Sequence, residues 1–205
     1  MMYHLVFWPL AAVCWLLFRL LFHWRVSGLE NVPQGGAIIA PNHQSIWDIP
    51  LVALALAGRR TYFMAKSELF RNQIFARIIR TLLAFPVRRG APDRAAIRYA
   101  IEILKQGELL TIFPEGTRSK TGELKEAEAG LSLIAARAQV PIVPVGIKGT
   151  RQMFSREKFL PTVEIHFGEP INVQAAESAD GEKPADIGVQ VMQAIAGLTG
   201  RNGSV

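Results

Sequence analysis

Cysteine is almost absent from this sequence, and its scarcity excludes two ways of holding a fold together. Cys14 is the only cysteine among 205 residues. An intrachain disulfide needs two cysteines and a thiolate metal cluster needs several, so neither is available here. His4, His23 and His166 are scattered and have no carboxylates at metal-ligand spacing, which argues against a metallohydrolase. We therefore expect no metal ion and no resident cofactor.

Acidic residues are also scarce relative to basic ones. The chain has 17 Asp and Glu against 23 Lys and Arg, and its sequence pI is about 9.8. Such a balance favours an anionic partner, whether a phosphate, a lipid head group or a nucleic acid. The basic residues are most concentrated between Arg59 and Arg98. Each basic residue close to an anionic membrane surface contributes about 1 kcal/mol to the free energy of binding. Nucleic acid is not expected, because aromatic residues do not interleave this stretch and no known nucleic-acid module is recognisable.

Long hydrophobic runs are missing except near the start, and that run is short for a membrane span. Residues 5–18 are uncharged and almost wholly apolar, but a span of about 20 residues would have to include Arg19. A secretory signal is not expected, since no basic region precedes the run and no small-residue cleavage pattern comes after it. Trp8, Trp15 and Trp24 are typical of a membrane interface, and Arg19 and Arg25 favour a cytoplasmic location for the rest of the chain.

The sequence thus predicts two parts. Residues 1–25 are expected to be a hydrophobic membrane anchor that lies in or dips into the bilayer, with a single span or a core helix as alternatives. Residues 26–205 are expected to form one α/β domain, because short apolar runs alternate there with helical patterns. The expected strands are 36–40, 61–66, 85–87, 108–113, 140–147 and 162–173. The expected helices are 48–58, 68–83, 92–107, 127–139 and 183–199. This order predicts a mixed, mostly parallel sheet flanked by helices, after a hydrophobic helical region that docks on a membrane.

A histidine and an aspartate lie five residues apart in "NHQSIWDIP", residues 42–50. Pro50 lacks an N–H and fits only the first turn of a helix, so the helix begins near Trp47 or Asp48 and leaves His43 in the preceding loop. From there the imidazole can fold back onto the carboxylate, which would fix its tautomer and leave Nε2 as a base. The alternative is a capped loop, with Asp48 as a helix N-cap. No G-x-S-x-G turn supplies a nucleophile, so a reacting alcohol would belong to the substrate.

A polar turn, "FPEGTRS" at residues 113–119, comes directly after an apolar strand. Pro114 and Gly116 predict a tight turn at the strand end, where ligands of α/β sheets bind. Arginine is suited to bidentate phosphate contact. Ends of several strands would deliver cations to one phosphate cradle, and those cations are Lys66, Arg88, Arg89 and Arg118. The alternative is a polar turn that carries only a surface salt bridge.

Taken together and in order, "NHQSIWD", "FPVRRG", "FPEGTRS" and "VPIVPV" resemble the four sequence blocks of the glycerolipid acyltransferases. Among these, the chain is most similar to the bacterial members that acylate 1-acyl-glycerol-3-phosphate. The resemblance covers residues 25–172. It implies that His43 is the base and Asp48 its partner. It also implies that Arg89, Glu115 and Arg118 contact the phosphate-bearing acceptor, with Gly116 as the turn. Thr117 projects from the same turn and is expected to take part in phosphate binding. Where the family often has Asp-Arg, this chain has Arg88-Arg89. The fourth block implies a role in shaping the site and contacting the acyl donor, for Val140, Pro141, Ile142, Val143, Pro144 and Val145.

The resemblance implies a membrane-associated enzyme of phospholipid biosynthesis. It would transfer a fatty acyl group from acyl-CoA or acyl carrier protein to the 2-hydroxyl of lysophosphatidic acid, giving phosphatidic acid, at the cytoplasmic face of the inner membrane. Membrane phospholipids would be its other partners. Three alternatives stay open: the same reaction on another lysolipid, such as a lyso-ornithine lipid or lysophosphatidylglycerol; a hydrolase or transacylase; and a non-catalytic protein that binds anionic lipid.

Overall fold

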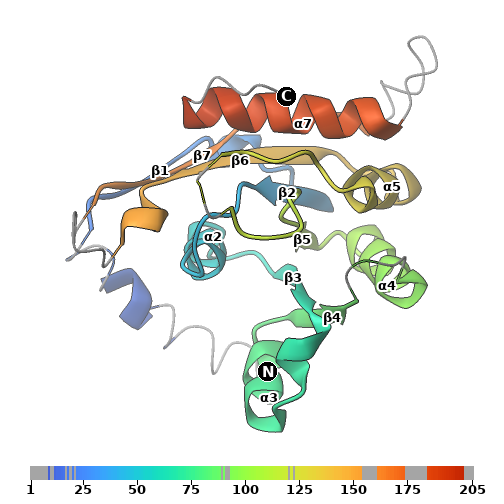
Figure 1. Cartoon of the computed structure of the whole chain (residues 1–205), viewed down its shortest axis with the longest axis horizontal. Helices are drawn as coiled ribbons and strands as arrows, with labels where there is room; N and C mark the ends of the chain where they lie inside the picture. The colour runs from blue at the N-terminus through green and yellow to red at the C-terminus, as the bar shows by residue number, and fades with distance from the viewer. Residues whose placement is uncertain are drawn as a thin grey trace.

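A seven-stranded sheet forms the centre of the molecule (Figure 1). The computed structural model describes residues 9, 12–16, 18, 20, 22–88, 90, 93–119, 121, 123–153, 161–173 and 184–200. The strands have the order β1-β7-β6-β2-β5-β3-β4, and each neighbouring pair is parallel except β6 and β7. Their bounds are β1 Trp24–Ser27, β2 Ala37–Pro41, β3 Thr61–Lys66, β4 Ala84–Val87, β5 Leu109–Thr111, β6 Ile142–Lys148 and β7 Val163–Phe167. The prediction of a mixed, mostly parallel sheet is confirmed.

Helices connect the strands and cover both faces of the sheet. The α-helices are α2 Asp48–Ala55, α3 Gln73–Thr81, α4 Arg94–Lys105, α5 Ala129–Ala138 and α7 Pro184–Thr199. Short 3₁₀ turns are η1 Leu29–Asn31, η2 Ser67–Phe70 and η3 Thr150–Gln152. Each α-helix lies within or close to a range that the hydrophobic periodicity predicts. The alternation of strand and helix is therefore an α/β fold, as expected.

The core has two layers because strand side chains alternate between the faces of the sheet. On β2, Ile38 and Ala40 belong to a buried cluster shared with α4, α5 and α7. Ala37 and Ile39 belong to the opposite cluster, which contains residues of α2. Figure 1 shows α7 along one side of the sheet and α2 on the other. Since these four β2 side chains are fully buried, the strand has the continuous apolar character of a central parallel strand.

Two local features differ from the sequence-based prediction. The helix expected over 68–83 is divided into η2 and α3, because Asn72 has an extended backbone and its side chain accepts the N–H of Phe75 as an N-cap. The strand β1 was not predicted. It begins at Trp24, lies at one edge of the sheet and pairs with its neighbour β7. The sheet therefore includes the last two residues of the segment predicted as an anchor.

The N-terminal segment packs on the domain through part of its surface. Residues 12–16 are helical. Phe18 and Phe22 are buried in the cluster of the α2 face, and the Phe18 ring lies 6.0 Å from Trp47 in an edge-on contact. Trp15 and Leu20 are exposed. No helix among the described residues has the length and hydropathy needed to cross a bilayer.

Candidate active site

Four parallel strands bring the sequence motifs to one edge of the sheet. Neighbouring β2, β5, β3 and β4 run in the same direction, so their carboxyl ends meet at one edge. His43 comes after β2, the turn 113–119 comes after β5, Lys66 ends β3 and Arg88 comes after β4. Ligands of open α/β sheets bind at this edge. The fold thus collects on one side the residues that the sequence has far apart.

His43 and Asp48 form the contact that the motif predicts. Asp48 is the first residue of α2, and its Oδ2 lies 2.9 Å from His43 Nδ1. The same oxygen accepts the backbone N–H groups of Gln44 and Ser45, each at 2.7 Å. A carboxylate only accepts, so Nδ1 carries the proton and Nε2 is the ring nitrogen that can accept one. The capped-loop alternative is not supported, because the N-cap of α2 is Trp47 and the Asp48 side chain bonds the loop.

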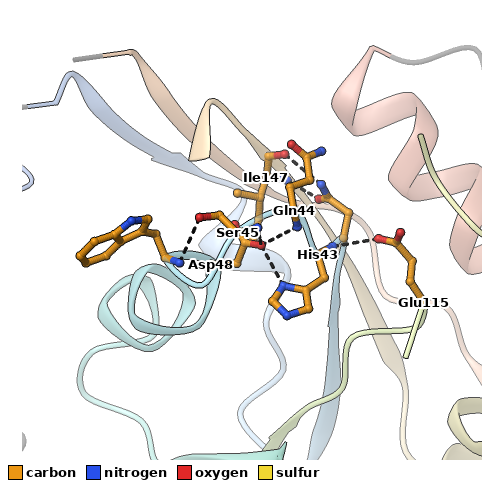
Figure 2. A network of polar contacts seen from close by, with 8 residues as sticks. His43, Gln44, Ser45, Asp48, Glu115 and Ile147 are labelled. Carbon is orange, nitrogen blue, oxygen red and sulfur yellow. Dashed lines mark hydrogen bonds and ion pairs between the residues drawn. The ribbon is translucent and has the colours of Figure 1, made fainter. Parts of the chain in front are cut away.

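The turn at residues 113–119 contacts the backbone and one ring face of His43. The backbone N–H of His43 donates to Glu115 Oε1 at 2.8 Å, and the N–H of Ser119 donates to the His43 carbonyl at 2.8 Å. The Phe113 ring stacks on the imidazole, with centroids 4.0 Å apart and planes at 26°. Figure 2 shows His43 between Asp48 and Glu115. Both backbone polar groups and one face of the ring of His43 are therefore fixed before any substrate binds.

Glu115 is turned inward rather than toward solvent. Its side chain is buried, and burial raises the pKa of the carboxyl although the His43 N–H and Lys125 act in the opposite direction. Its Oε2 has no hydrogen-bond partner within the described part of the chain. Through Oε1, Glu115 holds the backbone of His43. The contact of Glu115 with the phosphate-bearing acceptor stays a prediction.

The tight turn predicted for Gly116 is present. Gly116 has φ +63°, and a Cβ at this position would come within 3.0 Å of the Glu128 side chain. The next two side chains, Thr117 and Arg118, are exposed. Thr117 Oγ1 accepts a hydrogen bond from Lys125 Nζ at 3.2 Å. The turn therefore directs one side chain into the protein and the next two outward.

A family model described as Acyltransferase matches residues 23–148, a range that contains both His43 and the turn at 113–119. The chain belongs to the acyltransferase family.

The chain is also similar to two curated proteins and to one solved structure. The chain is 33% identical over 182 residues to the 1-acyl-sn-glycerol-3-phosphate acyltransferase of Streptococcus pneumoniae, a match that covers 82% of this chain and 64% of the relative. It is 32% identical to the Bacillus subtilis protein of the same name, over 72% of this chain and 73% of that protein. The crystal structure of the 1-acyl-sn-glycerophosphate (LPA) acyltransferase PlsC from Thermotoga maritima superposes with a TM-score of 0.73 at 31% identity, over 94% of this chain and 79% of that one. The matched region spans just under two thirds of the length of the Streptococcus relative.

Among the described residues, three of the cations predicted to form a phosphate cradle follow or end strands at this edge, or rim, of the sheet: Lys66, Arg88 and Arg118. Lys66 Nζ pairs with Glu68 at 3.1 Å, and the exposed Arg88 pairs with Asp93 at 3.5 Å. Strand spacing puts β3 about 10 Å and β4 about 14 Å from β2. Lys66 thus lies nearer to His43 than Arg88 does along the sheet. Arg89 lies outside the described residues, and the cradle itself stays a prediction.

The fourth sequence block of this family member forms the strand beside β2. Its residues precede or belong to β6, and the register pairs Pro144 with Ala40 and Val145 with Pro41. Ile142, Val143 and Val145 are fully buried. The block therefore supports the strand that leads to His43, while its contact with an acyl donor stays a prediction.

Sequence reasoning missed Asn42 as a supporting residue. Its amide Nδ2 donates to the Ile147 carbonyl at 3.0 Å and its Oδ1 accepts the Ile147 N–H at 2.7 Å. The fully buried amide thus continues the β2–β6 pairing beyond the strand end, immediately before His43. Its place before the histidine was the only available signal, because Ile147 lies 105 residues away.

Proposed function

We propose that this protein transfers a fatty acyl group from a thioester donor to the 2-hydroxyl of 1-acyl-glycerol-3-phosphate, giving phosphatidic acid. The observation that carries the proposal is the 2.9 Å contact between His43 Nδ1 and the buried Asp48, which presents Nε2 as a base. The names of the relatives support lysophosphatidic acid as the acceptor. Acyl-CoA or acyl carrier protein is the co-substrate.

The reaction proceeds by direct transfer. Nε2 of His43 takes the proton of the acceptor hydroxyl while that oxygen attacks the thioester carbonyl carbon. A C–O bond forms, the C–S bond breaks, and the departing sulfur takes a proton from the imidazolium. No acyl group becomes attached to the protein. Asp48 stabilises the imidazolium, and a base of this kind contributes about 10²–10⁴-fold to the rate.

Phosphate binding positions the acceptor. Arg118 and Thr117 are exposed on the turn that holds His43, and Lys66 ends the second strand from β2. A guanidinium at that place is suited to two phosphate oxygens at once. Arg88, at the outer end of the rim, belongs to the same proposal, as does Arg89, which lies outside the described residues. Holding the phosphate fixes the distance between the 2-hydroxyl and Nε2, which is where the larger part of the acceleration arises.

The acceptor carries a fatty chain, so the site has to reach a bilayer. Exposed Trp15 and Leu20 in the N-terminal segment support contact with a membrane, and Phe18 packed on Trp47 links that segment to the loop of His43. We propose the inner membrane as its location, with the domain on the cytoplasmic face.

The decisive experiment measures thiol release from acyl-CoA by purified protein in detergent, with and without lysophosphatidic acid, for wild type and His43→Ala. Release that requires the acceptor and falls at least about 10²-fold in a folded His43→Ala protein supports the proposal. His166→Ala is the matched control, since this histidine lies on β7 and hydrogen-bonds Ser27; it is expected to keep full activity.

Other outcomes distinguish the alternatives. Release without acceptor identifies a hydrolase, and product from another lysolipid identifies a different acceptor. If wild type is inert with acyl-CoA, acyl carrier protein is the second donor to test. Inertness with both donors, together with unchanged vesicle binding by His43→Ala, leaves only a lipid-binding protein.

A further inference from the structure

Helix α3 exposes an apolar face that its own domain does not cover. Ile74 is 78% exposed and Ile78 48%, whereas Ala76 on the other side of the helix is 1% exposed. The two isoleucines are four residues apart and share one face of the helix. Phe75 beside them is also exposed. The face of α3 that carries Ile74 and Ile78 therefore points away from the protein.

The neighbouring flank of α3 is polar and positively charged. A groove of about 640 Å³ runs between α3 and η2, and its lining residues are Phe70, Gln73, Ala76, Arg77, Arg80 and Thr81. The Arg80 guanidinium lies 5.3 Å from the centre of the Phe70 ring. Arg71 is exposed at the end of η2. The acid in this stretch, Glu68, is paired with Lys66, so the groove keeps a net positive charge.

Charge decides which partner fits this face. A second copy of the chain would bring Arg77 and Arg80 of each protomer toward the same residues of the other, because a two-fold contact is self-complementary. A bilayer that contains anionic phospholipid offers apolar chains to the isoleucines and phosphates to the arginines at the same time. Helices with this division of residues lie in the plane of the membrane interface.

We propose that α3 and η2 form a docking surface for an anionic phospholipid bilayer. Ile74, Ile78 and Phe75 enter the acyl boundary, and Arg71, Arg77 and Arg80 contact head-group phosphates. Figure 1 shows α3 at the end of the molecule away from α7, beyond β4. Since α3 connects the end of β3 to β4, docking brings the rim with Lys66 and Arg88 to the head-group level. The inference rests on the proposed function in taking a lipid as the substrate, and it adds a second membrane contact to that of the N-terminal segment.

The first test reads the environment of α3 directly. Cys14→Ser removes the only cysteine, and Ile78→Cys in that background then carries one environment-sensitive fluorophore. With phosphatidylcholine–phosphatidylglycerol vesicles we expect a blue shift and quenching by brominated lipid, and with phosphatidylcholine alone a much smaller change. Val189→Cys on α7, which is also exposed, is the matched control and is expected to stay in water. A label at position 78 that stays in water on vesicle-bound protein, or equal shifts at both positions, overturns the proposal.

The second test measures binding to the same vesicles by flotation. Arg71→Gln with Arg77→Gln should lower the partition coefficient about tenfold to thirtyfold, and added salt should reduce the difference. Arg137→Gln on α5, an arginine on a helix far along the chain from α3, should have little effect. Ile74→Ser with Ile78→Ser should weaken binding at every salt concentration. Unchanged partition of both double variants overturns the proposal, as does a change in oligomeric state in place of a change in binding.

Activity separates this inference from the proposed function. Acyl transfer to lysophosphatidic acid dispersed in detergent should be unchanged in Ile74→Ser/Ile78→Ser, because these side chains lie outside the site. If wild type lacks that activity while the label at position 78 still enters the bilayer, the proposed function fails and the docking surface stands.

Discussion

The surroundings of His43 and the cationic rim differ in how completely their polar groups are held. Around His43, one oxygen of Asp48, one oxygen of Glu115, the His43 carbonyl and the backbone N–H groups of His43 and Ser119 have hydrogen-bond partners, and the imidazole is stacked on Phe113. At the rim, the Arg88 side chain is 77% exposed, and Arg118 is exposed at the end of another strand. The side chain proposed as the base is therefore held by the protein alone, whereas the side chains proposed to bind phosphate are open to solvent.

The largest effect should come from breaking the tautomer of His43. In Asp48→Asn the side chain keeps its size but can donate a hydrogen, so Nδ1 is no longer held as the donor. We expect kcat to fall about 10²–10⁴-fold with little change in KM for lysophosphatidic acid. Steady-state kinetics measure both values. A change confined to KM would show that Asp48 acts on binding instead.

The next effect concerns the backbone of His43. Glu115→Ala leaves a buried N–H without its acceptor, which should cost about 1–3 kcal/mol of the free energy of unfolding and lower kcat. Glu115→Gln keeps an acceptor oxygen and should retain most stability and kcat. Urea unfolding and kinetics on both variants test this. If Glu115→Gln instead raised KM as much as Glu115→Ala, the carboxylate would belong to acceptor binding.

Asn42→Ala should resemble Glu115→Ala in size. It removes two hydrogen bonds to Ile147 and leaves that residue's N–H and carbonyl unpaired in the core, at a cost of about 1–3 kcal/mol. Because the support lies outside the reacting groups, the loss of unfolding free energy should exceed the loss in kcat. A stable variant with a large fall in kcat would contradict this assignment.

A smaller effect is expected at the rim. Arg118→Gln should raise KM for lysophosphatidic acid about tenfold or more, because it removes a charge-assisted hydrogen bond to the phosphate. Its free energy of unfolding should stay within about 0.5 kcal/mol of wild type, because the side chain is exposed. Arg88→Gln should change KM less, since Arg88 lies farther from β2 and already pairs with Asp93. Equal effects of the two substitutions would show that the phosphate lies between them.

The smallest expected effect is on how the free energy of unfolding depends on pH. Burial raises the pKa of Glu115 above its ordinary 4.5, so the folded state binds this proton more tightly than the unfolded state does. The stability this gives is fully present below pH 4.5 and is lost as the pH rises through the raised pKa. As the pH rises from 4.5 through the raised pKa of Glu115, wild type should therefore lose stability relative to Glu115→Gln. Unfolding of both proteins at several pH values measures the difference, and parallel profiles would contradict it.

Local interactions explain what could be predicted. Strand 61–66 and the contact of His43 with Asp48 depend on residues within one turn or strand, where spacing and the position of Pro50 determine geometry. The division of the helix over 68–83 was missed because Asn72 caps a new helix inside an unbroken apolar pattern. The order of the motifs also indicated the family, which the comparisons confirm.

Contacts between distant residues explain the rest. The sequence by itself determined most of the strands and helices, the loop that brings His43 to Asp48, and the excess of positive charge. The tertiary structure decided that β1 lies beside β7, that Glu115 points inward to a residue 72 positions away, and that α3 leaves its isoleucines uncovered. Periodicity identifies an apolar face within a single element, but only the packing of the other elements decides whether that face is covered.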